Sequence, residues 1–125
     1  MIERLSLFVY GTLMSDQASS SLLAGLGRQP ARTRGRLFAL RAGYPALVPG
    51  GDAWVYGELV APVTPRRLTL LDQYEGVPEG LYRRTRVEAV IGLSTFPAWA
   101  WVMDDPSLHG GRYLPGGRWR ATIRR

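Results

Sequence analysis

The sequence contains no cysteine, and it contains a single histidine, His109. The absence of cysteine excludes a disulfide framework, a cysteine nucleophile, an iron–sulfur cluster and any zinc site built from thiolates. A lone histidine excludes a centre with several histidine ligands, and it leaves one chance of a serine–histidine triad. No cluster of residues implies a metal or another cofactor.

Long hydrophobic runs are also missing. No stretch approaches the roughly 18 uninterrupted apolar residues that span a membrane. The first residues, which include Glu3 and Arg4, lack the charged, then apolar, then small layout of a signal peptide. We therefore expect a cytoplasmic protein with no membrane partner.

Lysine and asparagine are absent too, and all 16 basic residues are arginine against 10 acidic residues, for a formal net charge of +6. A basic balance suits nucleic acid or an anionic ligand, and Arg112 to Arg125 holds arginine without any acid. Such uniform use of arginine is, however, typical of codon bias across a genome. A solvated basic surface is the simpler interpretation, and a nucleic-acid-binding barrel ranks third among our hypotheses.

The 125 residues are 46% hydrophobic, which predicts one globular domain over 1–125 with a core of its own. Short apolar or alternating segments predict five or more strands, and capping and glycine signals predict two helices. The strands are expected at Leu5–Tyr10, Arg34–Leu40, Ala53–Val60, Tyr82–Ile91 and Ala98–Met103, and the helices from Ser15 or Asp16 to about Leu26 and from Thr64 and Pro65 to about Tyr74. This pattern favours a small curled sheet or barrel of the α+β class.

Glycine and proline mark the predicted turns. Gly43 to Val48 is interpreted as a turn followed by a short extended piece, and Pro49 to Asp52 as a second turn. Gly57 lies inside a predicted strand, which indicates a bulge or a close approach of another backbone.

The segment Tyr10 to Leu13 is the first candidate site. A glycine just after a strand lets successive backbone N–H groups point into one concavity, which binds carboxylate or phosphate oxygens or stabilises an oxyanion. A tight turn into the first helix explains the same residues without any function.

The segment Leu71 to Gly76 is the second candidate. Asp72 and Glu75 are two carboxylates near a helix C-terminus, where the helix dipole disfavours negative charge. In an apolar pocket the pKa of Glu75 would rise, and the side chain would serve as a general base near neutral pH. The alternative is a surface glutamate that ends a helix.

A third feature is the basic strand face of Arg84 and Arg86 with aromatic residues nearby. Grooves that bind nucleic acid combine arginine and stacking rings. We favour the other interpretation, a solvent-facing strand on which Glu88 balances the charge. His109 lies in a predicted loop and is interpreted as facing solvent.

Five short motifs occur in an order that resembles the gamma-glutamylcyclotransferase-like family, in its short form that includes the gamma-glutamylamine cyclotransferases. They are Val9–Leu13 (VYGTL), Gly43–Ala46 (GYPA), Val55–Leu59 (VYGEL), Leu71–Gly76 (LDQYEG) and Tyr82–Arg84 (YRR). The resemblance covers nearly the whole chain. It implies a small mixed β-barrel with flanking helices and one cavity.

The resemblance also implies an activity, the splitting of a gamma-glutamyl amide into 5-oxoproline and a free amine. The family's substrate-binding loop corresponds to Tyr10, Gly11, Thr12 and Leu13, and its catalytic acid/base to Glu75. We add Tyr113 as a further hydroxyl in the pocket, with Tyr44 and Tyr82 as rivals.

The leading hypothesis is therefore a cyclotransferase for a small gamma-glutamyl substrate that needs no cofactor. The substrate's own α-amine is the nucleophile, which suits a chain without cysteine and with one histidine. The alternative is a non-catalytic module of the same fold that binds a small metabolite. The amine leaving group and the oligomeric state are left open by the sequence.

Overall fold

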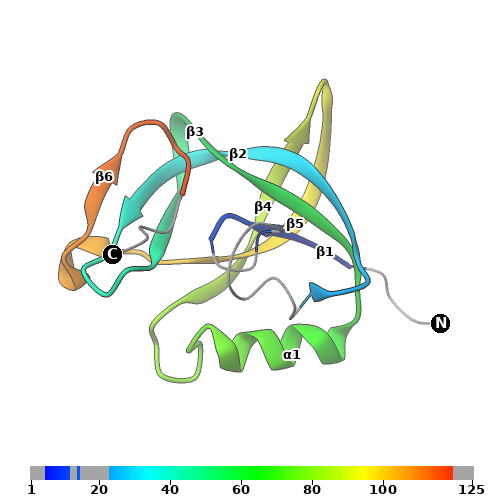
Figure 1. Cartoon of the computed structure of the whole chain (residues 1–125), viewed down its shortest axis with the longest axis horizontal. Coiled ribbons are helices and arrows are strands. Elements are labelled where there is room, and N and C mark those ends of the chain that lie inside the picture. The colour runs from blue at the N-terminus through cyan, green and yellow to red at the C-terminus, as the bar shows by residue number, and fades with distance from the viewer. Residues whose placement is uncertain (1–4, 12–13, 15–22, 120–125) are drawn as a thin grey trace, which may run out of the picture.

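The computed structural model describes residues 5–11, 14 and 23–119. Its elements are β1 (Leu5–Val9), β2 (Gly27–Ala39), β3 (Pro45–Val63), α1 (Pro65–Tyr74), β4 (Arg83–Ile91), β5 (Ser94–Val102), the short 3-10 helix η2 (Pro106–His109) and β6 (Arg112–Leu114) (Figure 1). Within these residues no helix has the length and the apolar character that crossing a membrane requires.

The strands form one mixed sheet that curls into a ring. Their order is β3-β1-β5-β4-β2-β6, and β3 also pairs with β2, so five strands return to their starting point while β6 extends the edge of β2. β1 and β5 are parallel, and the other pairs are antiparallel. The α+β class is confirmed.

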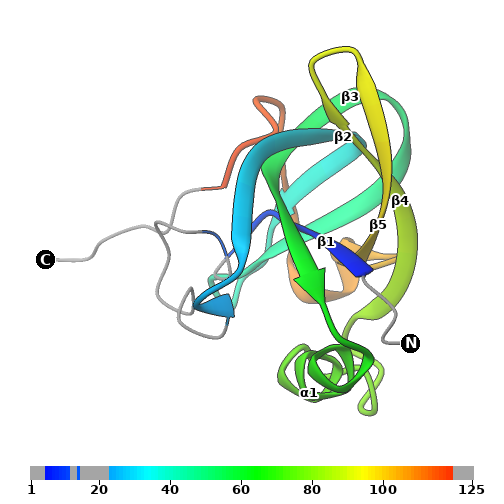
Figure 2. The same cartoon turned by 90° about the vertical axis from the view of Figure 1, so that its right-hand side faces the viewer.

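The barrel is confirmed only in part. Two of the strand pairings that close the ring are short: β1 pairs with β5 at Leu7–Trp99, and β2 pairs with β4 at Arg32–Val90. One α-helix, α1, is present in the described residues, and it lies across one end of the strands (Figures 1 and 2). The predicted first helix lies mostly outside the described residues. Its described end, residues 23–26, is a short 3-10 and turn segment and is not α-helical.

β2 and β3 are longer than the sequence predicts. β2 begins at Gly27 instead of Arg34, and β3 runs without interruption through the turn expected at Pro49–Asp52. The glycine and proline residues lie at a break in the pairing of β3 with β2. The paired residues change from Arg34–Trp54 to Gly35–Pro49, which leaves residues 50–53 without a partner in β2. Gly50 and Gly51 have positive φ angles of 97° and 83°, so the chain does turn locally there, but the turn lies within β3 and does not separate two strands.

The core has two sides because successive strand residues point to opposite faces. Leu7 and Val9 of β1 pack in one apolar cluster with Leu68 and Leu71 of α1. Phe8, between them in sequence, packs in a second cluster inside the ring. β1 is therefore buried on both faces, and its C-terminal end is held firmly between the helix and the ring.

The start of α1 agrees with its sequence signal. Thr64 is the N-cap, and its Oγ1 accepts a hydrogen bond of 3.2 Å from the backbone N–H of Arg67. Pro65 occupies the first helical position, where no N–H is needed. Leu68 and Leu71 form the buried stripe, while Leu70 is exposed.

The end of α1 fixes the position of Glu75, which is the C-cap residue. Gly76 follows in the left-handed conformation with φ of 71°. Its N–H donates to the carbonyl of Gln73 at 3.2 Å, and the N–H of Val77 donates to the carbonyl of Asp72 at 3.0 Å. These two bonds form a Schellman motif, which sets the direction in which the Glu75 side chain leaves the helix.

Candidate active site

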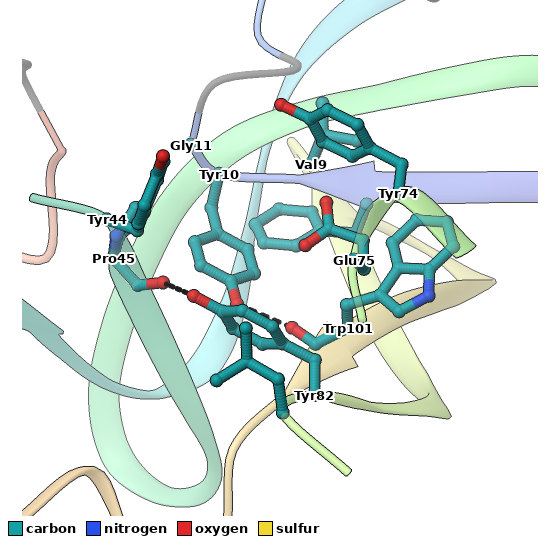
Figure 3. Close-up of a pocket in the computed structure, with 11 residues that line it drawn as sticks. Val9, Tyr10, Gly11, Tyr44, Pro45, Tyr74, Glu75, Tyr82 and Trp101 are labelled. Carbon is teal, nitrogen blue, oxygen red and sulfur yellow. Dashed lines mark hydrogen bonds between the residues drawn. The ribbon is translucent and has the colours of Figure 1, made fainter. Parts of the chain in front are cut away.

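A cavity of about 250 Å³ opens at the C-terminal end of β1. The end of α1 and the start of β3 form its other walls (Figure 3). Its lining is almost entirely aromatic or apolar, and Glu75 is the one charged side chain among the described residues that line it. This volume lies just below the roughly 300–1,000 Å³ of pockets for drug-sized ligands, so the cavity fits a small metabolite.

Two buried tyrosines form its inner wall. The Tyr10 hydroxyl donates a hydrogen bond to the carbonyl of Trp101 and accepts one of 3.2 Å from the N–H of Leu47. The Tyr82 hydroxyl donates to the carbonyl of Pro45 at 2.6 Å. Burial raises the pKa of both phenols, and the Glu75 carboxylate raises both further. Both tyrosines therefore stay neutral and tie β1, β3, β5 and the start of β4 together around the cavity.

Glu75 is partly buried, and its carboxylate points into the cavity, with Tyr74 on one side and Tyr10 and Tyr82 on the other (Figure 3). No ion pair to Glu75 occurs within the described part of the chain. Burial raises the pKa of Glu75 from 4.5 to about 7. A carboxyl group with this pKa exchanges a proton readily near neutral pH.

Asp72, one helical turn earlier, has a different environment. Its Oδ1 accepts hydrogen bonds from Arg84 Nε at 2.8 Å and from Trp101 Nε1 at 2.9 Å. The first contact is also an ion pair, and the second holds the indole ring that lines the cavity. The two carboxylates of the motif Leu71–Gly76 thus differ, since Asp72 is paired and structural whereas Glu75 faces open space.

The predicted binding loop reaches the same cavity as far as the structure describes it. Tyr10 and Gly11 line the wall, and Thr12 and Leu13 lie outside the described residues. Gly11 is packed against Pro45, because a Cβ on Gly11 would lie 2.7 Å from Pro45 Cγ. A side chain at Gly11 would therefore push the loop away from β3.

The structure places Tyr113 away from the cavity. It lies in β6, is 43% exposed, and its ring packs against Phe38 at 5.5 Å between centroids. β6 pairs with the outer edge of β2, which does not border the site. The two rivals, Tyr44 and Tyr82, do line the cavity.

Sequence reasoning also passed over Tyr74, Leu81 and Trp101, which line the cavity. Tyr74 stands directly before Glu75, and Leu81 directly before Tyr82, so proximity to two motifs was an available signal. Trp101 is brought to the site by the pairing of β5 with β4 and β1, which no local pattern reveals.

The remaining candidates lie elsewhere. Arg84 and Arg86 stack on Trp99 at 4.7 and 4.9 Å from the ring centroid, and His109 is exposed at the end of η2. In the part of the chain that the structure describes, no three His, Asp or Glu side chains come together as they would around a metal ion.

The raised pKa of Glu75 makes a prediction about stability. Because the folded protein binds this proton more tightly than the unfolded chain, the free energy of unfolding falls as pH rises from about 4.5 to about 7. Above pH 7 the folded state carries a partly buried charge. We expect Glu75→Gln to unfold with a free energy about 1–3 kcal/mol higher than the parent at pH 8.

Urea unfolding at pH 8 and pH 4.5 measures this difference, which should shrink to a few tenths of a kcal/mol, roughly, at the lower pH. Glu88→Gln, at an exposed carboxylate of β4, is the matched control and should show little dependence of its effect on pH. An equal effect of Glu75→Gln at both pH values would contradict the raised pKa.

A ring of strands, with a small aromatic cavity that contains one carboxylate at the end of β1, places the chain in a class of small α+β proteins with a candidate ligand site. Comparison with known proteins identifies the family. Residues 7–121 match the family described as gamma-glutamyl cyclotransferase, AIG2-like. The chain belongs to this family.

Individual relatives agree with this assignment. The chain is 32% identical to the gamma-glutamylaminecyclotransferase of Bos taurus over an alignment of 139 positions, which covers 86% of this chain and 80% of that one. It is 30% identical to AIG2-like protein D of Arabidopsis thaliana over an alignment of 120 positions, which covers 84% of this chain and 73% of that one. The crystal structure of an AIG2-like protein from Mus musculus superposes with a TM-score of 0.75 at 20% identity, covering 98% of this chain and 99% of that chain, which shows the shared fold.

Proposed function

We propose that this chain is a gamma-glutamyl amide cyclotransferase, which converts its substrate to 5-oxoproline and a free amine, with Glu75 as general acid/base. The observation that carries the proposal is the partly buried Glu75 carboxylate, directed into a small aromatic cavity with a pKa of about 7. Family membership supports the reaction class.

The reaction needs a proton acceptor and a folded substrate but no protein nucleophile. Glu75 takes a proton from the substrate's α-ammonium, and the freed amine attacks the γ-carbonyl carbon, so that a C–N bond closes a five-membered ring. Glu75 returns this proton to the leaving nitrogen as the C–N bond to that nitrogen breaks. It then takes the second proton from the ring nitrogen and passes it to the released amine, so that the products are the neutral lactam ring of 5-oxoproline and the protonated amine. The same carboxyl group therefore serves as base and then as acid, and atoms and charge balance without a cofactor.

The cavity favours this chemistry in two ways. Its small volume holds the glutamyl chain bent, and well-oriented intramolecular reactions reach effective molarities of about 10⁵–10⁸ M. Its aromatic wall partly buries the carboxylate, and this burial raises the pKa of Glu75 to about 7, close to neutral pH. We assign Tyr10, Gly11, Thr12 and Leu13 to the binding loop, where backbone N–H groups hold the α-carboxylate or the oxyanion.

The proposal is tested by incubating the purified protein with a panel of gamma-glutamyl amides and dipeptides and measuring 5-oxoproline. Release of 5-oxoproline together with the free amine supports it. A rise in thermal stability with these compounds and no 5-oxoproline would instead select the alternative, a module that binds the metabolite without turning it over.

A further inference from the structure

A second cavity, of about 590 Å³, is separate from the candidate active site. The two cavities have no described lining residue in common. Strands β2 and β3, the end of β4 and the segment after β6 contribute to the walls of the second one. Its volume falls within the roughly 300–1,000 Å³ of pockets that hold small organic ligands, so it has room for more than a single ion.

Two arginines line this cavity, and both are neighbours of Tyr56. Arg32 of β2 is the pairing partner of Tyr56 in β3, and the Arg118 guanidinium lies 4.1 Å from the centre of the Tyr56 ring. Arg32 also stacks on Trp54, at 4.1 Å from the ring centre. Stacking on a ring restricts the directions in which a guanidinium group points, so less conformational freedom is lost when an anion binds to it.

Neither Arg32 nor Arg118 has an anionic partner in the part of the chain that the structure describes, where the ion pairs involve other arginines. Glu58 is the one acidic side chain among the described lining residues, and Arg28 pairs with it at 3.0 Å. The positive charge of the two lining arginines is therefore left without a local counter-charge. An anion in the cavity would gain charge-assisted hydrogen bonds from both.

Trp119 adds an unused hydrogen-bond donor. It lines the cavity, is 8% exposed, and its buried Nε1 has no hydrogen-bond partner among the described residues. The segment that carries it is fixed on β3, because the N–H of Tyr56 donates to the carbonyl of Gly117 at 2.8 Å. Buried indole N–H groups usually have an acceptor, and leaving one without an acceptor costs free energy. A ligand with oxygen or nitrogen atoms would supply it.

The rest of the wall is largely apolar. Pro30 and Ala31 of β2 and Val90 and Ile91 of β4 contribute to it. An inorganic anion alone would leave this surface in contact with water, whereas a ligand with a flat apolar part would cover it. The cavity therefore fits a ligand that combines an anionic group with an organic body.

We propose that this second cavity binds an organic phosphate with a flat, largely apolar body, the chemistry of a nucleoside monophosphate. The phosphate accepts hydrogen bonds from Arg32 and Arg118, whose planar guanidinium groups match pairs of its oxygens. Because phosphate oxygens point in several directions, two arginines from different segments hold one phosphate more readily than one carboxylate, whose two oxygens share a plane. The organic body covers the apolar wall and accepts the hydrogen bond of Trp119 Nε1.

Three probes separate the two parts of this ligand. AMP carries both a phosphate and a base, adenosine lacks the phosphate, and ribose 5-phosphate lacks the base. Isothermal titration calorimetry at about 0.15 M salt, where exposed charges are largely screened, measures the three Kd values. We expect a Kd for AMP below about 1 mM, and binding about tenfold or more tighter than that of either fragment. A weaker Kd, or equal affinity for either fragment, overturns the inference.

Variants of the two arginines test the place of binding. Arg32→Gln and Arg118→Gln should each weaken AMP binding by about tenfold or more, because each removes a charged hydrogen-bond donor. Arg86→Gln is the matched control: Arg86 also stacks on a tryptophan, Trp99, at 4.9 Å, but it does not line the cavity. This control should bind AMP as the parent does.

Equal losses in Arg32→Gln and Arg86→Gln would show that AMP is attracted by the basic surface as a whole, which contradicts a built site. The same pattern with a single-stranded oligonucleotide that binds far more tightly than AMP would assign the arginines to a strand-binding surface instead. Both results overturn the inference. Neither depends on turnover, so the test is independent of the cyclotransferase proposal.

The indole N–H signals of the unaltered protein provide a second readout. In a nitrogen–proton correlation spectrum, AMP should shift the signal of Trp119, whose N–H gains an acceptor. Trp101 is the internal control, because its Nε1 already donates to Asp72 at 2.9 Å and its ring lines the first cavity. A shift of the Trp101 signal while that of Trp119 stays in place would locate AMP in the first cavity and overturn the inference.

Discussion

Glu75→Gln is expected to lower kcat/KM for a gamma-glutamyl amide by about 10²–10⁴-fold, the usual contribution of a positioned general acid/base. Glutamine keeps the shape of the side chain and its place at the C-cap of α1, but it accepts no proton from the α-ammonium. The rate of 5-oxoproline release at pH 8 measures the effect, while the parent is assayed in parallel.

The pH profile of the parent provides an independent check. Because Glu75 acts as a base only when ionised, kcat/KM should fall about tenfold for each pH unit below about 7. Glu88→Gln should retain the activity and the acid limb of the parent. Full turnover by Glu75→Gln, together with an unchanged acid limb, would show that another group takes the proton.

The candidate acid was accessible from the sequence because its surroundings are local. Thr64 and Pro65 mark the start of α1, Gly76 marks its end, and these two signals leave Glu75 as the capping residue. What the sequence could not supply was burial. The pKa of Glu75 rises because segments far from it in the chain, including Tyr10 and Trp101, close around its carboxylate.

The same limit explains the wrong choice among tyrosines. Tyr113, Tyr44 and Tyr82 all follow glycine, proline or loop signals, so local patterns do not separate them. Their positions depend on which strands pair: β6 joins the outer edge of β2, whereas β3 and β4 carry Tyr44 and Tyr82 toward the end of β1. Strand pairing across long separations is not encoded by any short motif.

The sequence predicted a curled sheet or barrel, but it predicted β2 and β3 to be shorter than they are. Glycine and proline at Pro49–Asp52 indicate a turn by local chemistry, yet β3 passes through this segment because its partners in β2 continue on both sides. The local turn at Gly50 and Gly51 is therefore accommodated inside one long strand: four residues are displaced from the ladder, and pairing with β2 continues on both sides.

Gly57 is a residue whose replacement should strongly disturb the pairing of β1 with β3 in this ring. The sequence predicted a bulge or a close backbone approach there, and the structure shows the close approach. A Cβ on Gly57 would lie 2.1 Å from the carbonyl oxygen of Val9 and 2.9 Å from Phe8 Cζ. Both contacts are on β1 and its immediate end, which continues into Tyr10 and Gly11, so any shift that relieves the clash moves the wall of the cavity.

We therefore expect Gly57→Ala to lower the free energy of unfolding by about 3 kcal/mol or more, the upper part of the range for overpacked sites. The melting temperature should fall by roughly 10 °C or more. Urea unfolding and thermal melts followed by circular dichroism measure both. Gly116→Ala is the control, since a Cβ there meets nothing within 4 Å, and it should leave stability within about 0.5 kcal/mol. A Gly57→Ala protein as stable as this control would show that β1 separates from β3 without loss, and the close approach would then have no part in holding Tyr10 and Gly11 at the cavity.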